Sequence, residues 1–142
     1  GGMAKAVAAA LRDRGHRTGT IVARNEASGR ALAELYGFDW APAADALSAS
    51  LLINATPIGM AGPDADHLAF PERAVAAAAM IFDVVALPVE TPLMRLAATL
   101  GRQRISGAKV ATLQALEQFI LYTGIHPTPD QVADAEAFAR AP

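Results

Sequence analysis

Residues 51–60 have the sequence LLINATPIGM, in which a continuous apolar run leads into a turn that contains Pro57 and Gly59. An apolar run without polar alternation is typical of a strand that is buried on both faces. Outward from this stretch the chain alternates between short apolar strands and helices. The predicted strands are residues 18–23, 51–55, 80–85 and 104–106. This alternation predicts the α/β class, with helices covering both faces of a doubly wound, Rossmann-like parallel sheet.

Helices between these strands are predicted from their start and stop signals. Thr91 and Pro92 form an N-cap and first-turn pair, and Gly101 ends the helix that they open. Residues 26–36 form a helix that carries Ala31, Leu32 and Leu35 on one face. The remaining predicted helices are residues 3–14, 71–79, 107–122 and 130–140. Residues 38–49 are variable in character, and we expect one short strand and one helical turn there.

The N-terminus begins with Gly1, Gly2 and Met3 and runs directly into an apolar helix. A glycine-rich helix start can receive a phosphate, because its backbone N–H groups and the helix dipole favour an anion. A flexible terminus is the alternative for a glycine pair taken alone. Such a glycine loop normally follows a buried strand. We therefore expect the sheet to be incomplete at the N-terminus and the chain to be a piece of a longer protein.

Composition narrows the classes of protein. The 142 residues suffice for one compact domain, and 53% hydrophobic with 18% charged residues argues against disorder. A net charge of −2 disfavours nucleic acid as a partner. The absence of cysteine and the wide spacing of three histidines predict no metal site. No apolar run is long enough to span a membrane, so we expect no membrane partner and a location in the reducing cytoplasm.

Ligands of parallel sheets bind at the carboxyl ends of the strands, so the residues just after each strand are candidates. Arg24 and Asn25 follow the first strand, where an arginine would pair with the 2′-phosphate of NADP. Thr56 follows the second strand and offers a hydroxyl, while Val84 lies in an apolar segment suited to a nicotinamide ring. Each has a purely structural alternative. Arg24 could be a solvated loop charge, the Thr56 turn could only connect elements, and Val84 could only pack.

Taken together, these segments resemble the shikimate dehydrogenase family, specifically its shikimate 5-dehydrogenase-like branch. Residues 54–60, NATPIGM, match that family's Asn-Ala-Thr-Pro-x-Gly-Met motif fully. Residues 1–6 resemble the second half of its glycine-rich loop, and residues 23–25 occupy the place of its Asn-Arg-Thr motif. Residues 82–93 resemble its segment from the aspartate to Thr-Pro-Leu, and Gly107 with Gln114 matches its last motif. The resemblance covers essentially the whole chain.

The resemblance implies the NADP-binding C-terminal part of an oxidoreductase that interconverts 3-dehydroshikimate and shikimate in aromatic amino-acid biosynthesis. It implies that Gln114 donates its amide to a substrate hydroxyl. The residues implied to contact NADP are Gly1, Gly2, Met3, Arg24, Asn25, Thr56, Val84 and Gly107. Residues 1–106 would form the truncated dinucleotide-binding domain, and residues 107–142 would be helices that face an N-terminal catalytic domain preceding Gly1. A homodimer is compatible with this interpretation.

Several departures bear on activity and substrate. Ala23 and Ala86 replace an asparagine and a substrate-binding tyrosine of the family, so shikimate itself, quinate or a related cyclic hydroxy acid remain open as substrates. Residues 110–112, VAT, replace Met-Leu-Val. Neither Lys5 nor Lys109 corresponds to the family's catalytic lysine, which the resemblance places in the N-terminal domain, so no catalytic residue is predicted here. The alternative function is a stand-alone NADP-binding or interaction module without chemistry.

Overall fold

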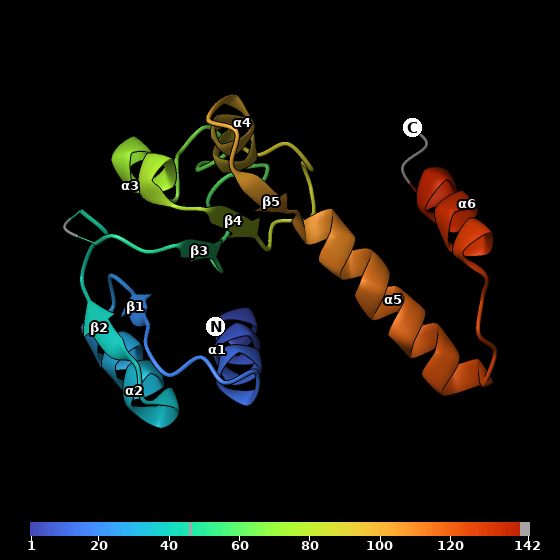
Figure 1. The fold of residues 1–142 in the computed structure, drawn as a ribbon, viewed down its shortest axis with the longest axis horizontal. Coiled ribbons are helices and arrows are strands. Elements are labelled where there is room, and N and C mark those ends of the chain that lie inside the picture. Colours follow the sequence, from blue (N-terminus) through green and yellow to red (C-terminus); the bar gives the residue numbers. More distant parts are fainter. Residues whose placement is uncertain (46, 140–142) are drawn as a thin grey trace.

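The computed structural model describes residues 1–45 and 47–139. Helices and strands alternate along the chain as predicted (Figure 1). The helices are α1 (Gly2–Asp13), α2 (Glu26–Tyr36), α3 (Glu72–Ala77), α4 (Pro92–Thr99), α5 (Gly107–Thr123) and α6 (Pro129–Ala139). The strands are β1 (Thr20–Val22), β2 (Asp39–Ala41), β3 (Leu51–Asn54), β4 (Met80–Asp83) and β5 (Gln103–Ile105). No helix in this part of the chain is long and apolar enough to cross a membrane.

All strand pairs among the described residues are parallel, but they form two sheets instead of one. β1 pairs with β2, and β3, β4 and β5 pair in that order, so Figure 1 shows two separate pieces. The order of a classic doubly wound sheet is 3-2-1-4-5-6. The two sheets fit the two sides of that order, with β2 and β1 as strands 3 and 2 and with β3, β4 and β5 as strands 4, 5 and 6. No described residue forms a strand in the central position of strand 1. The predicted parallel α/β fold is thus confirmed, and the described strands form two sheets.

The main core lies around the central strand β4. Ile81 is fully buried between helices α3 and α4, which contribute Val75 and Leu93. Alanines fill the remaining space in this core at positions 74, 78 and 97, so the two short helices can lie close to the sheet. The burial of these apolar side chains stabilises the part of the sheet from which the candidate site projects.

Helix α2 buries a different face from the one predicted. Gly29 and Ala33 are buried, whereas Ala31 is exposed and Leu35 is 66% exposed. The cause is Trp40, because a Cβ at position 29 would lie only 2.3 Å from its Nε1 atom. The indole can pack against the helix only where side chains are small. Of the predicted apolar face only Leu32 is half-buried, so the helix packs mainly through another face, whereas the predicted helix bounds are confirmed.

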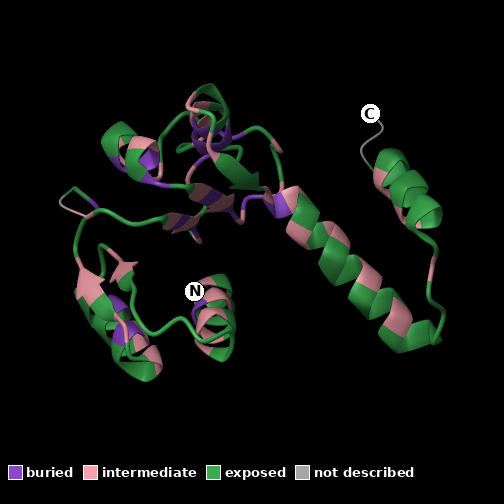
Figure 2. Cartoon of the chain, viewed as in Figure 1, coloured by how far each residue is buried: buried purple, intermediate pink, exposed green. Residues whose placement is uncertain are grey.

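Helices α5 and α6 are mostly exposed and extend away from the sheets (Figures 1 and 2). Gly107 is the one buried residue of α5, and residues 129–139 of α6 include none. Large apolar side chains on both helices face solvent, with Leu121 78% exposed and Phe138 85% exposed. Apolar helices in a stable protein bury such side chains against another surface.

Predicted and observed bounds differ slightly elsewhere. Helix α3 occupies residues 72–77, with Pro71 as its N-cap, instead of 71–79. The strand expected within residues 38–49 is β2. Of the helical turn expected there, the described residues show a single turn, closed by the N–H of Leu47 donating to the carbonyl of Ala44 at 3.1 Å. Part of that segment, Ala46, and the predicted end of the last helix at Arg140 lie outside the described residues.

Candidate functional site

The site is built at the carboxyl ends of β3 and β4. These strands pair in parallel with Asn54 opposite Asp83, so the turns that follow them begin side by side. The backbone N–H of Val84 donates to the carbonyl of Asn54 at 3.0 Å and extends the pairing by one step. The structure therefore brings the turn that contains Thr56 next to the segment that contains Val84.

The Thr56 turn is held by hydrogen bonds within the NATPIGM segment. Asn54 Oδ1 accepts from the backbone N–H of Thr56 at 3.0 Å and from its hydroxyl at 2.6 Å. The same hydroxyl accepts from the N–H of Ile58 at 3.2 Å. Gly59 has φ +89, a conformation that glycine adopts without strain, and a Cβ there would lie 3.1 Å from the Cβ of Thr91. These contacts explain the residue types of the motif.

Beneath the two turns lies a buried polar cluster, which we define as Asn54, Asp83 and Thr91. All three are at most 1% exposed. One carboxyl oxygen of Asp83 accepts from Asn54 Nδ2 at 3.0 Å, and the other accepts from the Thr91 hydroxyl at 2.6 Å. Sequence reasoning did not identify this cluster. The available signal was a polar residue at the end of each of two apolar strands.

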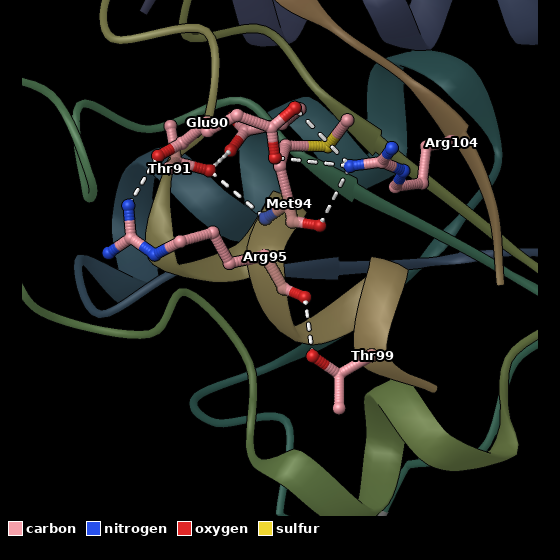
Figure 3. A network of polar contacts seen from close by, with 7 residues as sticks. Glu90, Thr91, Met94, Arg95, Thr99 and Arg104 are labelled. Carbon is pink, nitrogen blue, oxygen red and sulfur yellow. Dashed lines mark hydrogen bonds and ion pairs between the residues drawn. The ribbon is translucent and has the colours of Figure 1, made fainter. Parts of the chain in front are cut away.

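Thr91 also begins helix α4, as predicted. Its hydroxyl accepts from the N–H of Met94 at 3.2 Å, so one side chain caps the helix and binds Asp83. Figure 3 shows the contacts around this cap, where Arg104 of β5 donates to Glu90 at 3.1 Å and to the Met94 carbonyl at 3.2 Å. The start of α4 is thereby fixed to the cluster on one side and to β5 on the other.

Gly107 begins α5 in direct contact with the segment after β4. A Cβ at this position would lie 2.4 Å from the carbonyl oxygens of Val84 and Val85, which are backbone atoms. Only glycine permits this approach. The three residues expected along the nicotinamide half of NADP, Thr56, Val84 and Gly107, are thus located on turns that the structure brings together.

The residues expected at the adenosine 2′-phosphate follow β1, and those expected at the pyrophosphate lie at the start of α1. Arg24 is exposed and forms no ion pair within the described part of the chain. Asn25 caps α2, because its Oδ1 accepts from the N–H of Ser28 at 2.9 Å. Gly1 precedes α1 without a side-chain cap, and a Cβ at Gly1 or Gly2 would meet nothing within 4 Å. Met3 is 44% exposed.

Gln114 is exposed on α5, seven positions after Gly107, and makes no hydrogen bond to a described side chain. It does not line the apolar groove of about 760 Å³ that runs between α5 and α6. That groove, which sequence reasoning also missed, is bordered at one end by Ala86 and Leu87 and along its length by Phe119. Its lining is almost entirely apolar.

These features define the class: a Rossmann-like α/β fold with its candidate site at the carboxyl ends of the parallel strands. No family model matches the chain. A shikimate dehydrogenase-like protein of Haemophilus influenzae is 48% identical over 141 residues, which are 99% of this chain and 52% of that protein. A shikimate dehydrogenase (NADP(+)) of Rhodospirillum rubrum is 32% identical over 99% of this chain and 52% of its own length.

Comparison with solved structures gives the same class of relatives. A shikimate 5-dehydrogenase-like protein superposes with a TM-score of 0.96 at 47% identity, over 99% of this chain and 53% of that one. Shikimate 5-dehydrogenase of Thermus thermophilus in complex with NADP(H) and shikimate gives 0.79 at 30%, over 94% and 50%. Quinate dehydrogenase of Corynebacterium glutamicum in complex with NAD gives 0.80 at 26%, over 95% and 51%. The chain is homologous to shikimate dehydrogenases and shikimate dehydrogenase-like proteins, and it spans about half the length of these relatives.

Proposed function

We propose that this chain is the NADP-binding half of a shikimate dehydrogenase-like oxidoreductase. Its reaction would reduce 3-dehydroshikimate, or a related cyclic keto acid, to the hydroxy acid with NADPH. The observation that carries the proposal is the register of β3 and β4, which brings Thr56 and Val84 together beside Gly107. Because Gly107 has no side chain, α5 begins in backbone contact with the Val84 segment.

The adenosine side supports NADP over NAD. Arg24 is exposed at the end of β1, and its guanidinium matches the geometry of a phosphate. Asn25 uses its Oδ1 for the α2 cap, so its Nδ2 is left as a donor at the N-terminus of that helix. The acid in that first turn, Glu26, is paired with Arg30 at 2.7 Å. The quinate dehydrogenase structure is in complex with NAD, so the choice between NADP and NAD is tested directly.

Replacing Arg24 with alanine tests the cofactor. We expect Arg24→Ala to weaken NADP binding about ten- to a hundredfold, because a charge-assisted contact to the 2′-phosphate is lost. NAD binding should stay nearly unchanged, since NAD lacks that phosphate. Calorimetric titration of both nucleotides into the protein with its complete sequence measures the two losses. Arg17→Ala is the matched control, an exposed arginine in the loop before β1. Equal losses for NADP and NAD would refute the role of Arg24.

We propose residues 1–106 as the dinucleotide-binding domain and residues 107–142 as helices that face the substrate domain of the same protein. A parallel strand that precedes Gly1 would occupy the position between β1 and β3. The apolar groove between α5 and α6 supports the second part, because exposed Phe119 and Ile125 would be covered there. The relative with a TM-score of 0.96 has the same arrangement of these helices in a chain about twice as long.

Gln114 would contact the substrate from α5, about two turns after Gly107. An amide can donate to one hydroxyl and accept from another, which suits a polyhydroxylated ring. We expect Gln114→Ala to lower kcat/KM by on the order of 1–3 kcal/mol, mainly through the KM for substrate. Steady-state kinetics and the melting temperature separate this role from a structural one. Gln118→Ala, one turn further along α5 and also exposed, is the control. An unchanged substrate KM with a lower melting temperature would contradict the assignment.

A further inference from the structure

The carboxyl group of Asp83 is 0% exposed and lies among neutral partners. Its three hydrogen-bond donors are Asn54 Nδ2, the Thr91 hydroxyl and the backbone N–H of Val85, the last at 3.1 Å. Burying an acidic group is costly unless its oxygens are hydrogen-bonded. Here the carboxyl oxygens are bonded, but the arrangement gains no ion pair. An apolar residue at position 83 would leave these three buried donors without an acceptor, so Asp83 bonds together the segments that carry them.

The three donors come from three separate segments of the site. Asn54 ends β3, Val85 lies in the segment after β4, and Thr91 begins α4. Asp83 is therefore the one group in the described structure that bonds directly to all three. A buried polar group with fully paired atoms fixes the segments that it joins in one arrangement.

From Asn54 the arrangement reaches the whole Thr56 turn. While Asn54 Nδ2 donates to Asp83, it also donates to the carbonyl of Ile58 at 3.0 Å. Asn54 Oδ1 meanwhile accepts from the N–H and hydroxyl of Thr56. The methyl side of Thr91 packs against Gly59 in the same turn. Removing the Asp83 carboxyl would leave the two segments joined only by the backbone pairing of β3 and β4, while β1, α2 and Arg24 make no contact with Asp83.

We propose that Asp83 is a positioning residue that holds the Thr56 turn and the Val84 segment in register, so that together they receive the nicotinamide half of the nucleotide. This role rests on the proposed function, since it concerns the same site. It assigns Asp83 no contact with the nucleotide itself, because the side chain is buried beneath both turns.

Two ligands separate this role from a general loss of structure. NADPH spans both ends of the proposed site, whereas adenosine 2′,5′-bisphosphate has the adenosine and 2′-phosphate but no nicotinamide. In the protein with its complete sequence, Asp83→Ala should weaken NADPH binding about tenfold or more, corresponding to about 1.4 kcal/mol. Binding of adenosine 2′,5′-bisphosphate should change less than about twofold, within ordinary measurement scatter.

Conservative variants sharpen the test. Asp83→Asn should recover most of the NADPH affinity, because its amide oxygen can accept from Asn54 and Val85 while its amide nitrogen donates to the Thr91 hydroxyl. Thr91→Val removes one donor to Asp83 and should give a smaller loss of the same kind, which keeps the proposal testable if Asp83→Ala does not fold. Thr99→Val is the control on the same helix, because Thr99 bonds only to the Arg95 carbonyl one turn before it.

Equal weakening of both ligands, or unchanged NADPH affinity in Asp83→Ala and Thr91→Val, would overturn the positioning role. Amide hydrogen exchange provides a readout that needs no nucleotide. Faster exchange confined to residues 55–60 and 84–86 in these variants supports the proposal, whereas a uniform increase that includes residues 21–35 overturns it. If the wild-type protein bound neither ligand, the proposed cofactor would be refuted, and the exchange pattern would still decide whether Asp83 couples the two turns.

Discussion

We expect the 142 residues alone to oxidise NADPH with 3-dehydroshikimate slowly. The rate should be at least about a hundredfold lower than that of a protein that also contains the other half found in the relatives. Hydride transfer to a ketone needs an acid for the developing alkoxide, and a positioned group contributes about 10²–10⁴-fold. In the described part of the chain, the two lysines lie on α1 and in the first turn of α5, and Asp83 is buried beneath the turns. The decrease in NADPH absorbance with time measures the rate of the 142-residue piece and that of the longer protein.

A binding control belongs with this rate measurement. Circular dichroism must show that the 142-residue piece is folded, and titration with NADPH shows whether its nucleotide site has formed. A folded piece with NADPH affinity and no activity agrees with the proposal. The alternative of a stand-alone binding module would be favoured if the protein with its complete sequence were equally inactive with NADPH on cyclic keto acids. A rate for the piece close to that of the whole protein would contradict the division of roles.

Gly107→Ala is expected to lower both the stability of the protein and its affinity for NADPH. The added Cβ would lie 2.4 Å from backbone atoms of Val84 and Val85, which cannot rotate away as a side chain could. Overpacking of this kind costs about 1–3 kcal/mol, even though alanine favours the helix by about 1 kcal/mol over glycine. We expect a lower melting temperature together with weaker NADPH binding, because the start of α5 must move away from the Val84 segment.

Lys109→Ala is the matched control for Gly107→Ala, since Lys109 lies in the same first turn of α5 and is exposed. Thermal denaturation and NADPH titration on the two variants measure stability and binding. If Gly107→Ala matched the control in both, the close approach of α5 to β4 would not exist in solution, and the geometry of the nicotinamide end would need revision.

Local signals in the sequence predicted most of the secondary structure. The Thr91-Pro92 pair marks the start of α4, and the end of α2 before Gly37 matches a glycine in the left-handed region, with φ +65. Such caps depend on neighbours within a few residues, which the sequence displays directly. The buried face of α2 was not predictable in this way. It depends on Trp40, which reaches the helix from the next strand and donates its N–H to Ala23 at 3.2 Å.

The candidate site was predictable in part. Its position at the strand ends follows from the parallel sheet, and the residue types after the strands predicted Thr56 and the Val84 segment. Gly107 was implied only by the resemblance to the shikimate dehydrogenase family. The cluster of Asn54, Asp83 and Thr91 was not predicted. Polar residues at two strand ends gave a signal, but Asn54 and Asp83 are 29 residues apart and meet only through the register of β3 and β4. The surroundings of Gln114 depend on whatever covers α5, which the sequence of these residues does not specify.

The central claim is that this chain binds NADP across the strand ends, and a crystal structure of the protein with its complete sequence in complex with NADPH tests it most directly. We predict the 2′-phosphate within hydrogen-bonding distance of the Arg24 guanidinium and the pyrophosphate at the backbone N–H groups of Gly2 and Met3. The nicotinamide should lie beside Val84 and Gly107. NADPH bound at another surface, or a nicotinamide away from the Thr56 and Val84 turns, would contradict the account.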